Sequence, residues 1–179
     1  MSPRIVVAVV VFASLVGGPP VTGRGLDPTP LPEFEVTALD GSVVDGSRLR
    51  FGGTWLLVYV QQPDCPACVS ILSILEREAA ALSPSRLVVI VGGATPDELR
   101  AAKAAYPELP AGWFADPSRA AFARLELVGA PVSLGLRGGT IEWRLSGMLA
   151  DTHHVRSILM SWLARPGQSS SGPSSRNAR

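Results

Sequence analysis

Residues Thr54–Leu75, TWLLVYVQQPDCPACVSILSIL, decide the fold, and they contain both cysteines of the 179-residue chain. The first seven of them, Thr54–Val60, form a continuous apolar run, which is typical of a strand covered on both faces. After the cysteines, apolar residues recur at the spacing of one helix face. The residues on that face are Cys68, Ile71, Leu72, Leu75, Ala79 and Leu82. The stretch predicts a buried strand, a loop that carries Cys65 and Cys68, and a helix.

Strands and helices alternate on both sides of this stretch. Glu33–Val44 predicts two short strands about an Asp-Gly turn, and Arg86–Gly92 predicts a second buried strand. Two further segments each begin with a cap residue, Thr or Asp, followed by Pro, as helices often do. The later elements are the helices Thr95–Tyr106, Asp116–Leu127 and Asp151–Leu163 and the hairpin Pro131–Leu145. The order predicts an α/β domain with a central mixed sheet flanked by helices, an N-terminal β-hairpin and a strand–helix insertion.

The two ends of the chain differ in composition from this domain. Residues 1–23 combine one Arg, an apolar run of 14 residues (Ile5–Gly18) and small residues, which is the order of a secretory signal. A membrane-spanning helix needs about 20 residues, so cleavage is expected, and an uncleaved segment would instead be an N-terminal membrane anchor. We expect a linker over residues 24–30, a folded domain over 31–164 and a disordered Ser-rich tail over 165–179. These features predict a periplasmic or otherwise extracytoplasmic protein.

Charge excludes one class of partner. The formal net charge is +1, and the basic residues are scattered along the chain. A nucleic-acid partner is therefore not expected, because such proteins carry a basic patch or stripe.

The close spacing of the two cysteines leaves several functions open. A disulfide across two intervening residues restricts the unfolded chain very little, so a purely structural staple is disfavoured. Zinc requires more ligands than this pair, and the adjacent His153 and His154 point about 100° apart on a helix. Copper accepts two thiolates, so a copper metallochaperone stays open as an alternative. No metal site and no cofactor are predicted.

Redox chemistry fits the position of the pair best. A sulfur at a helix N-terminus is close to unpaired N–H groups and to the positive end of the helix dipole, which favours the nucleophilic thiolate. Cys65 comes first and would attack a disulfide, and Cys68, on the apolar face, would resolve the mixed disulfide. Pro66 suits the first helical turn because its missing N–H has no partner to lose there.

With these motifs, residues 31–163 resemble the thioredoxin superfamily, and more narrowly the exported thiol–disulfide oxidoreductases of the TlpA/ResA group, with the MauD type as a near relative. The resemblance rests on LPEFEVTALDGSVV, on the strand before CPAC, on the strand–helix insertion over residues 86–106 and on DPSRAAFARLELVGAPVSLGLRGGTIEWRLSG. It implies a thioredoxin-like fold in which Pro131 is a cis-proline facing the cysteines and Ala130 offers its backbone to an extended substrate.

The resemblance also implies a reaction and its partners. It implies an enzyme that exchanges a redox-active disulfide with cysteine-containing client proteins outside the cytoplasm, such as apocytochrome c. Electrons would come from a membrane thiol–disulfide carrier. The dipeptide Pro66-Ala67 lacks the His of strong oxidants, which favours the reductase direction.

Three positions depart from the family pattern. Asp64 stands where an aromatic residue usually precedes the first cysteine, and Tyr59 stands where a buried acid usually relays a proton. Ile71 replaces a Glu that commonly follows the second cysteine. These departures leave open a third reading, a thioredoxin-like interaction module without catalytic activity.

Overall fold

The computed structural model describes residues 28–49, 53–61, 65–82, 86–147 and 152–164. The predicted signal segment, the predicted tail and Asp64 lie outside these residues. The elements in chain order are β1 (Thr29–Pro30), β2 (Glu35–Thr37), β3 (Val43–Asp45), η1 (Gly46–Leu49), β4 (Thr54–Gln61), α1 (Pro66–Arg77), η2 (Ala79–Ala81), β5 (Leu87–Gly92), α2 (Pro96–Ala104), β6 (Gly112–Asp116), α3 (Ala120–Arg124), β7 (Val132–Arg137), β8 (Thr140–Ser146) and α4 (Thr152–Leu163).

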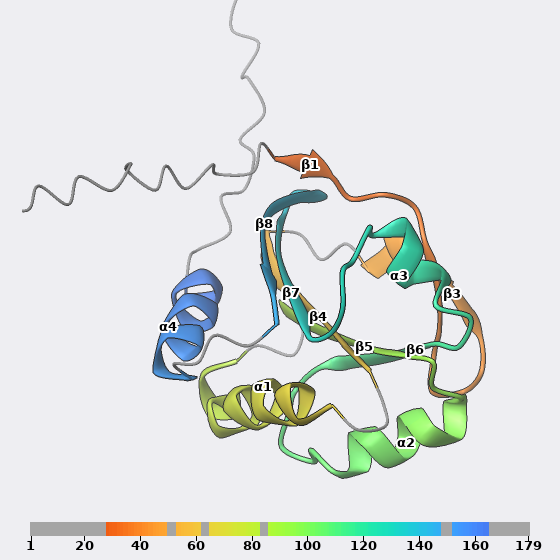
Figure 1. Cartoon of the computed structure of the whole chain (residues 1–179), viewed down its shortest axis with the longest axis horizontal. Helices are drawn as coiled ribbons and strands as arrows, with labels where there is room; N and C mark the ends of the chain where they lie inside the picture. Colours follow the sequence, from red (N-terminus) through yellow and green to blue (C-terminus); the bar gives the residue numbers. More distant parts are fainter. Residues whose placement is uncertain (1–27, 50–52, 62–64, 83–85, 148–151, 165–179) are drawn as a thin grey trace, which may run out of the picture.

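One eight-stranded sheet forms the centre, in the order β1-β8-β7-β4-β5-β6-β2-β3. β4, β5 and β6 run parallel, whereas β7 pairs antiparallel with both β4 and β8. The β2–β3 hairpin joins the far side of β6. The predicted mixed sheet with an N-terminal hairpin and a strand–helix insertion is confirmed (Figure 1).

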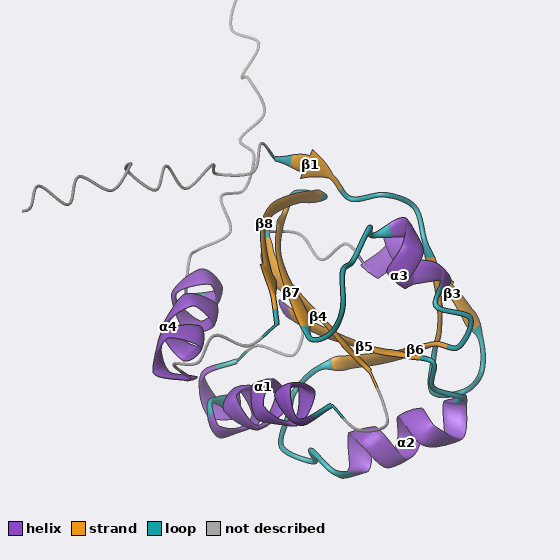
Figure 2. Ribbon diagram, in the orientation of Figure 1, coloured by secondary structure: helices purple, strands orange, loops and turns teal. Residues whose placement is uncertain are grey.

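Helices cover both faces of the sheet, which explains why β4 and β5 are buried along almost their whole length. On one face, α1, α2 and α4 pack against Val58, Val60 and Val89. On the other face, α3 packs against Leu57 and Tyr59. The two layers are visible in Figure 2. The carboxyl ends of β4, β5 and β6 meet at one edge of the sheet, where Gln61 is in register with Gly92, and Gly92 with Asp116.

Two predicted helix boundaries are wrong. The helix after the cysteines ends at Arg77 and does not reach Leu82, because the amide of Glu78 bonds back to Leu75 and the chain tightens into the 3₁₀ turn η2. Leu82 is nevertheless buried. The helix predicted over Asp116–Leu127 is only α3, because residues 112–116 extend the sheet as β6 and Arg119 turns the chain at a φ of 60°.

Another element lies at the end of the predicted linker. Thr29 and Pro30 form β1, which pairs antiparallel with Ile141 and Thr140 of β8. The described fold therefore includes these two residues at the outer edge of the sheet.

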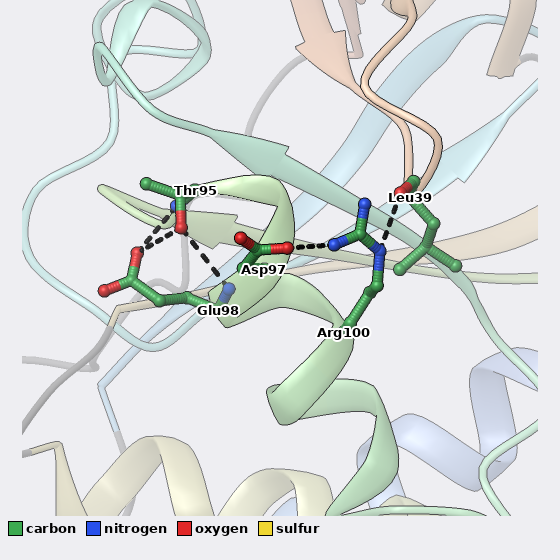
Figure 3. Close-up of polar contacts among 5 residues, drawn as sticks. All are labelled: Leu39, Thr95, Asp97, Glu98 and Arg100. Atoms are coloured by element: carbon green, nitrogen blue, oxygen red, sulfur yellow. Dashed lines mark hydrogen bonds and ion pairs between the residues drawn. The ribbon is translucent and has the colours of Figure 1, made fainter.

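The insertion is fixed to the sheet at the start of α2. Thr95 and Glu98 form a capping box, in which the Thr95 hydroxyl accepts from the Glu98 amide and the Glu98 carboxylate accepts from the Thr95 amide. Arg100 then pairs with Asp97 and donates to the carbonyl of Leu39, in the turn between β2 and β3 (Figure 3). This contact joins α2 to the N-terminal hairpin.

Candidate active site

Cys65 and Cys68 form a disulfide at the N-terminus of α1, directly after the buried strand β4. Cys65 is the N-cap residue, and the helix begins at Pro66. The Cys65 side chain is partly exposed, whereas Cys68 is 4% exposed and belongs to the core cluster beneath the helix. The structure therefore places Cys65 as the outer sulfur and Cys68 as the inner one.

Backbone amides point at both sulfurs. The amide of Cys68 donates to Cys65 Sγ at 3.1 Å, and the amide of Gln61 donates to Cys68 Sγ at 3.5 Å. Such donors stabilise a negative sulfur more than a neutral one. When the disulfide is reduced, the outer sulfur therefore occupies a position that favours the thiolate.

The loop before β7 approaches the outer sulfur. The Ala130–Pro131 peptide bond is cis, and the Ala130 carbonyl oxygen lies 3.9 Å from Cys65 Sγ. A disulfide sulfur carries no hydrogen, so this is a van der Waals approach and not a hydrogen bond. The Pro131 carbonyl accepts from the amide of Gly147 at 2.7 Å, which ties the loop to the end of β8. The structure thus brings together Cys65, Ala130 and Pro131, which are far apart in sequence.

The backbone of Ala130 is available to a ligand. Among the described residues, its amide has no hydrogen-bond partner, and its carbonyl oxygen lies beside the Cys65 sulfur. The Ala130 side chain is half-buried, whereas Pro66, the first residue of α1, is exposed. An extended polypeptide placed here could pair with Ala130 while one of its residues reached Cys65.

A buried acid near this sheet edge was not predicted as part of the site. Asp116 is 1% exposed, and its carboxylate accepts from the Tyr59 hydroxyl at 3.0 Å and from the amides of Ala121 and Phe122 at 3.2 and 2.9 Å. Burial, and then the negative charge of Asp116, raise the pKa of Tyr59 far above its ordinary value. Gly92 is required between them, since a Cβ there would collide with the Tyr59 hydroxyl.

The Tyr59–Asp116 pair links the strand that precedes the cysteines to the segment that leads to the cis-proline loop, and it makes no hydrogen bond to either sulfur. Tyr59 packs with α3, on the face of the sheet opposite the cluster that contains Cys68. Its register partner on β7 is Val132, directly after the cis-proline. Asp116 binds the start of α3, which leads into the loop that ends at Pro131. The pair therefore positions that loop relative to β4.

The histidines lie elsewhere. His153 and His154 are exposed in the first turn of α4. Among the described residues, no three His, Cys, Asp or Glu side chains gather in a group that could hold a metal ion. No described helix has the length and apolar character needed to cross a membrane.

The amino-acid sequence was compared with protein-family profiles and with curated proteins. No protein-family profile and no curated protein matches the chain.

Solved structures, in contrast, match most of the chain. A secreted disulfide oxidoreductase of Mycobacterium tuberculosis, homologous to Escherichia coli DsbE, aligns with a TM-score of 0.58 and 21% identity over 72% of this chain and 95% of its own. A thioredoxin-family thiol:disulfide interchange protein of Chlorobium tepidum aligns at 0.53 and 18%, over 76% and 97%. An exposed lipoprotein thioredoxin of Streptococcus pneumoniae aligns at 0.52 and 16%, over 72% and 98%. The chain has the thioredoxin-like fold that these proteins share.

Proposed function

We propose that the protein is an exported thiol–disulfide oxidoreductase that exchanges its Cys65–Cys68 dithiol with cysteines of extracytoplasmic proteins. One observation carries the proposal: a partly exposed sulfur caps a helix, is bonded to a buried second sulfur, and lies 3.9 Å from the unpaired backbone of Ala130. The thioredoxin-like fold, which solved thiol–disulfide oxidoreductases share, supports the same chemistry.

The reaction in the reductive direction has two steps. The Cys65 thiolate attacks a client disulfide, so that a mixed disulfide forms and one client thiolate leaves and takes up a proton. Cys68, as its thiolate, then attacks the Cys65 sulfur and releases the second client thiolate. Two electrons and two protons pass from the protein to the client, and the Cys65–Cys68 disulfide is formed.

The client would bind beside the disulfide. Ala130 would pair with an extended client segment, Pro131 would fix the direction of that backbone, and the exposed Pro66, next to Cys65, would contact the client. Apocytochrome c or a similar cysteine protein is the proposed client, and a membrane thiol–disulfide carrier is the proposed electron donor. These identities come from the TlpA/ResA resemblance and from the dipeptide between the cysteines.

An extracytoplasmic location completes the proposal. Residues 1–23 carry the pattern of a secretory signal. Two of the solved proteins with this fold are described as secreted or as an exposed lipoprotein.

Trapping a client tests the proposal directly. In a Cys68→Ser variant the second step is blocked, so we expect mixed disulfides between Cys65 and client proteins to accumulate outside the cytoplasm. Non-reducing gels and mass spectrometry would identify them, and a Cys65→Ser variant, which has no outer sulfur, is the matched control. Equal trapping by both variants, or none by either, would contradict the proposal.

The reduction potential decides the direction of transfer. We expect a value of about −250 mV or lower for the Cys65–Cys68 couple, as in reductases, whereas about −120 mV would indicate an oxidant. A disulfide that exchanges with no thiol would indicate an interaction module. Tight stoichiometric Cu(I) binding without exchange would indicate a metallochaperone.

A further inference from the structure

The loop between α3 and β7, residues 125–131, brings Ala130 to the outer sulfur and is attached to β8 at both of its ends. Its last residue, Pro131, accepts a hydrogen bond at 2.7 Å from the amide of Gly147, which directly follows β8. Its first two residues offer their carbonyls to the side chain of Arg144, within β8. These attachments hold the loop relative to the sheet.

The Arg144 contact lies where α3 ends and the loop begins. One guanidinium nitrogen donates to the Leu125 carbonyl at 2.6 Å and to the Glu126 carbonyl at 3.3 Å. Leu125 is the C-cap residue of α3. The last carbonyls of a helix have no partner within the helix, and a cationic side chain nearby can bind them. Arg144 comes from a strand, so it also fixes the end of α3 against the sheet.

The backbone of the loop turns sharply at the same place. Glu126 has a φ of 51°, in the left-handed region where a residue with a side chain is disfavoured. Its carbonyl is one of the two that Arg144 binds. The arginine therefore stabilises a backbone conformation that the local preference of the chain opposes.

A short path leads from this contact to the sulfur. Only residues 127–129 separate Glu126 from Ala130, and Leu127 among them is buried. The Ala130 carbonyl oxygen lies 3.9 Å from Cys65 Sγ. A misplacement of about 1 Å in a group that positions a substrate is enough to slow a reaction strongly. A displaced start of the loop would therefore disturb the geometry at the sulfur.

We propose that Arg144 is a positioning residue of the exchange reaction, which holds the loop so that a client segment paired with Ala130 meets the Cys65 sulfur. The inference rests on the proposed function and adds to it a residue that acts through the loop. It requires Arg144 for substrates that carry a peptide backbone, and not for small disulfides, which have no backbone to pair with Ala130. An arginine that only capped a helix would affect stability and no substrate in particular.

Two disulfides of different kinds provide the test. One joins two copies of a short peptide through its single cysteine, which is flanked by alanines, and the other is dithiobis-nitrobenzoate, which has no peptide backbone. The reduced full chain transfers two electrons and two protons to either disulfide by the two steps given above, forming its own disulfide and releasing two thiols. Chromatography measures the released thiols, and equilibration with glutathione measures the reduction potential.

The expected result is a loss confined to the peptide substrate. Arg144→Met keeps a long side chain without its donors, and kcat/KM for the peptide disulfide should fall about fivefold, the order of effect of one hydrogen bond. Its rate with dithiobis-nitrobenzoate and its reduction potential should not change. Arg144→Lys, whose ammonium group can still donate to both carbonyls, should regain most of the peptide rate.

Arg137→Met is the matched control. Arg137 is likewise a partly buried arginine of the β7–β8 hairpin, where it pairs with Glu142 and lies over the ring of Trp162. Its register partner is Thr54, the first residue of β4, so it lies at the end of that strand far from the cysteines. Its loss should leave the rates with both disulfides unchanged.

Other outcomes overturn the inference in distinguishable ways. An unchanged peptide rate in Arg144→Met, or an equal loss with both disulfides, overturns the positioning role and leaves the exchange reaction standing. The same peptide-specific loss in Arg137→Met does so too. Should Arg144→Met not fold, Arg144→Gln, which keeps a neutral donor on a shorter side chain, is judged by the same outcomes. A wild-type protein inert toward both disulfides overturns the exchange reaction and the positioning role with it.

Discussion

α1 and α2 begin in the same way and use their first turns differently. Each follows a buried parallel strand at the same edge of the sheet, and each has a cap residue followed by proline, Cys65-Pro66 in α1 and Thr95-Pro96 in α2. In α2 the cap and the third helical residue, Glu98, satisfy each other's amides through oxygen atoms. In α1 the same two positions are Cys65 and Cys68, and they are joined by a disulfide.

The difference separates a structural helix start from a reactive one. Oxygen caps stabilise α2 whatever the redox conditions. The sulfur cap of α1 changes its charge with its redox state, since the amide of Cys68 faces a neutral disulfide sulfur in one state and can face a thiolate in the other. The backbone geometry that stabilises one helix therefore serves chemistry in the other.

Replacing the sulfur cap with an oxygen cap should have the largest effect. In Cys65→Thr we expect all disulfide exchange to disappear, because no nucleophile remains, while the hydroxyl still accepts from the Cys68 amide. Unfolding by urea should give a stability within about 1 kcal/mol of the reduced wild type, and Cys65→Ala should be about 1 kcal/mol less stable than Cys65→Thr. If Cys65→Thr retained exchange, the outer sulfur would not be the nucleophile.

The start of α3 differs from both, because the carboxylate that accepts from its first amides is buried. Asp116 caps α3 from a distance and is buried, whereas Asp97, in the first turn of α2, is exposed. Asp116→Asn places an amide donor where three donors converge, so we expect a loss of about 3 kcal/mol in the free energy of unfolding. Asp97→Asn should change it by less than about 0.5 kcal/mol. Denaturant titration measures the free energy of unfolding of both variants. Comparable losses would mean that the buried Asp116 carboxylate contributes no more to stability than the exposed Asp97 carboxylate.

The stability of the fold at alkaline pH should depend on Tyr59, whose hydroxyl donates to the buried Asp116 carboxylate. The unfolded chain releases the tyrosine proton near pH 10.0, whereas burial and Asp116 raise the pKa of Tyr59 in the fold. Above pH 10 the folded state therefore binds more protons than the unfolded state, and stability falls by about 1.4 kcal/mol per pH unit for this group.

The Tyr59→Phe variant isolates that contribution. It should lose stability less steeply than the wild type above pH 10, and both should show no tyrosine-linked slope at neutral pH. Tyr106, whose pKa burial also raises, is the other tyrosine of the chain, so the double Phe variant should lose the remaining tyrosine slope. Parallel curves for wild type and Tyr59→Phe would show that the hydroxyl titrates equally in both states.

Local patterns explain which parts of this arrangement the sequence could predict. Continuous apolar runs are enough to identify β4 and β5, and a cap followed by proline is enough to place the start of α2. The cysteine pair could be placed between a strand and a helix for the same reason. These signals lie within a few residues of the features they predict.

Features that depend on distant partners could not be predicted in this way. β6 has only five residues, and it is a strand because β5 and β2 pair with it. Its last residue, Asp116, resembles a local N-cap before proline, but its carboxylate binds Tyr59, 57 positions earlier, and amides five and six residues later. A short apolar run between Gly112 and the Asp116-Pro117 pair is the one local signal that indicates this strand.

The smallest expected effect concerns the exposed cap of α2. The amide and then the hydroxyl of Thr95 bind the Glu98 carboxylate, and they hold its pKa below the ordinary value of 4.5. A lowered pKa stabilises the fold above pH 4.5, and this stabilisation is lost as the pH falls through the folded value. In Thr95→Ala, NMR titration should show the Glu98 pKa moving back toward 4.5, although only part of the way because the backbone amide remains.

The same variant separates the two helix starts. Thr95→Ala should cost about 1 kcal/mol of stability and shift the acid limb of the stability curve, with no change in the rate of disulfide exchange. Cys65 and Cys68 carry no carboxylate, so the start of α1 should show no corresponding acid transition in hydrogen exchange of its amides. If Thr95→Ala altered the rate of disulfide exchange, the starts of α1 and α2 would be coupled across the sheet edge. α2 would then be part of the active site and not only a structural support for it.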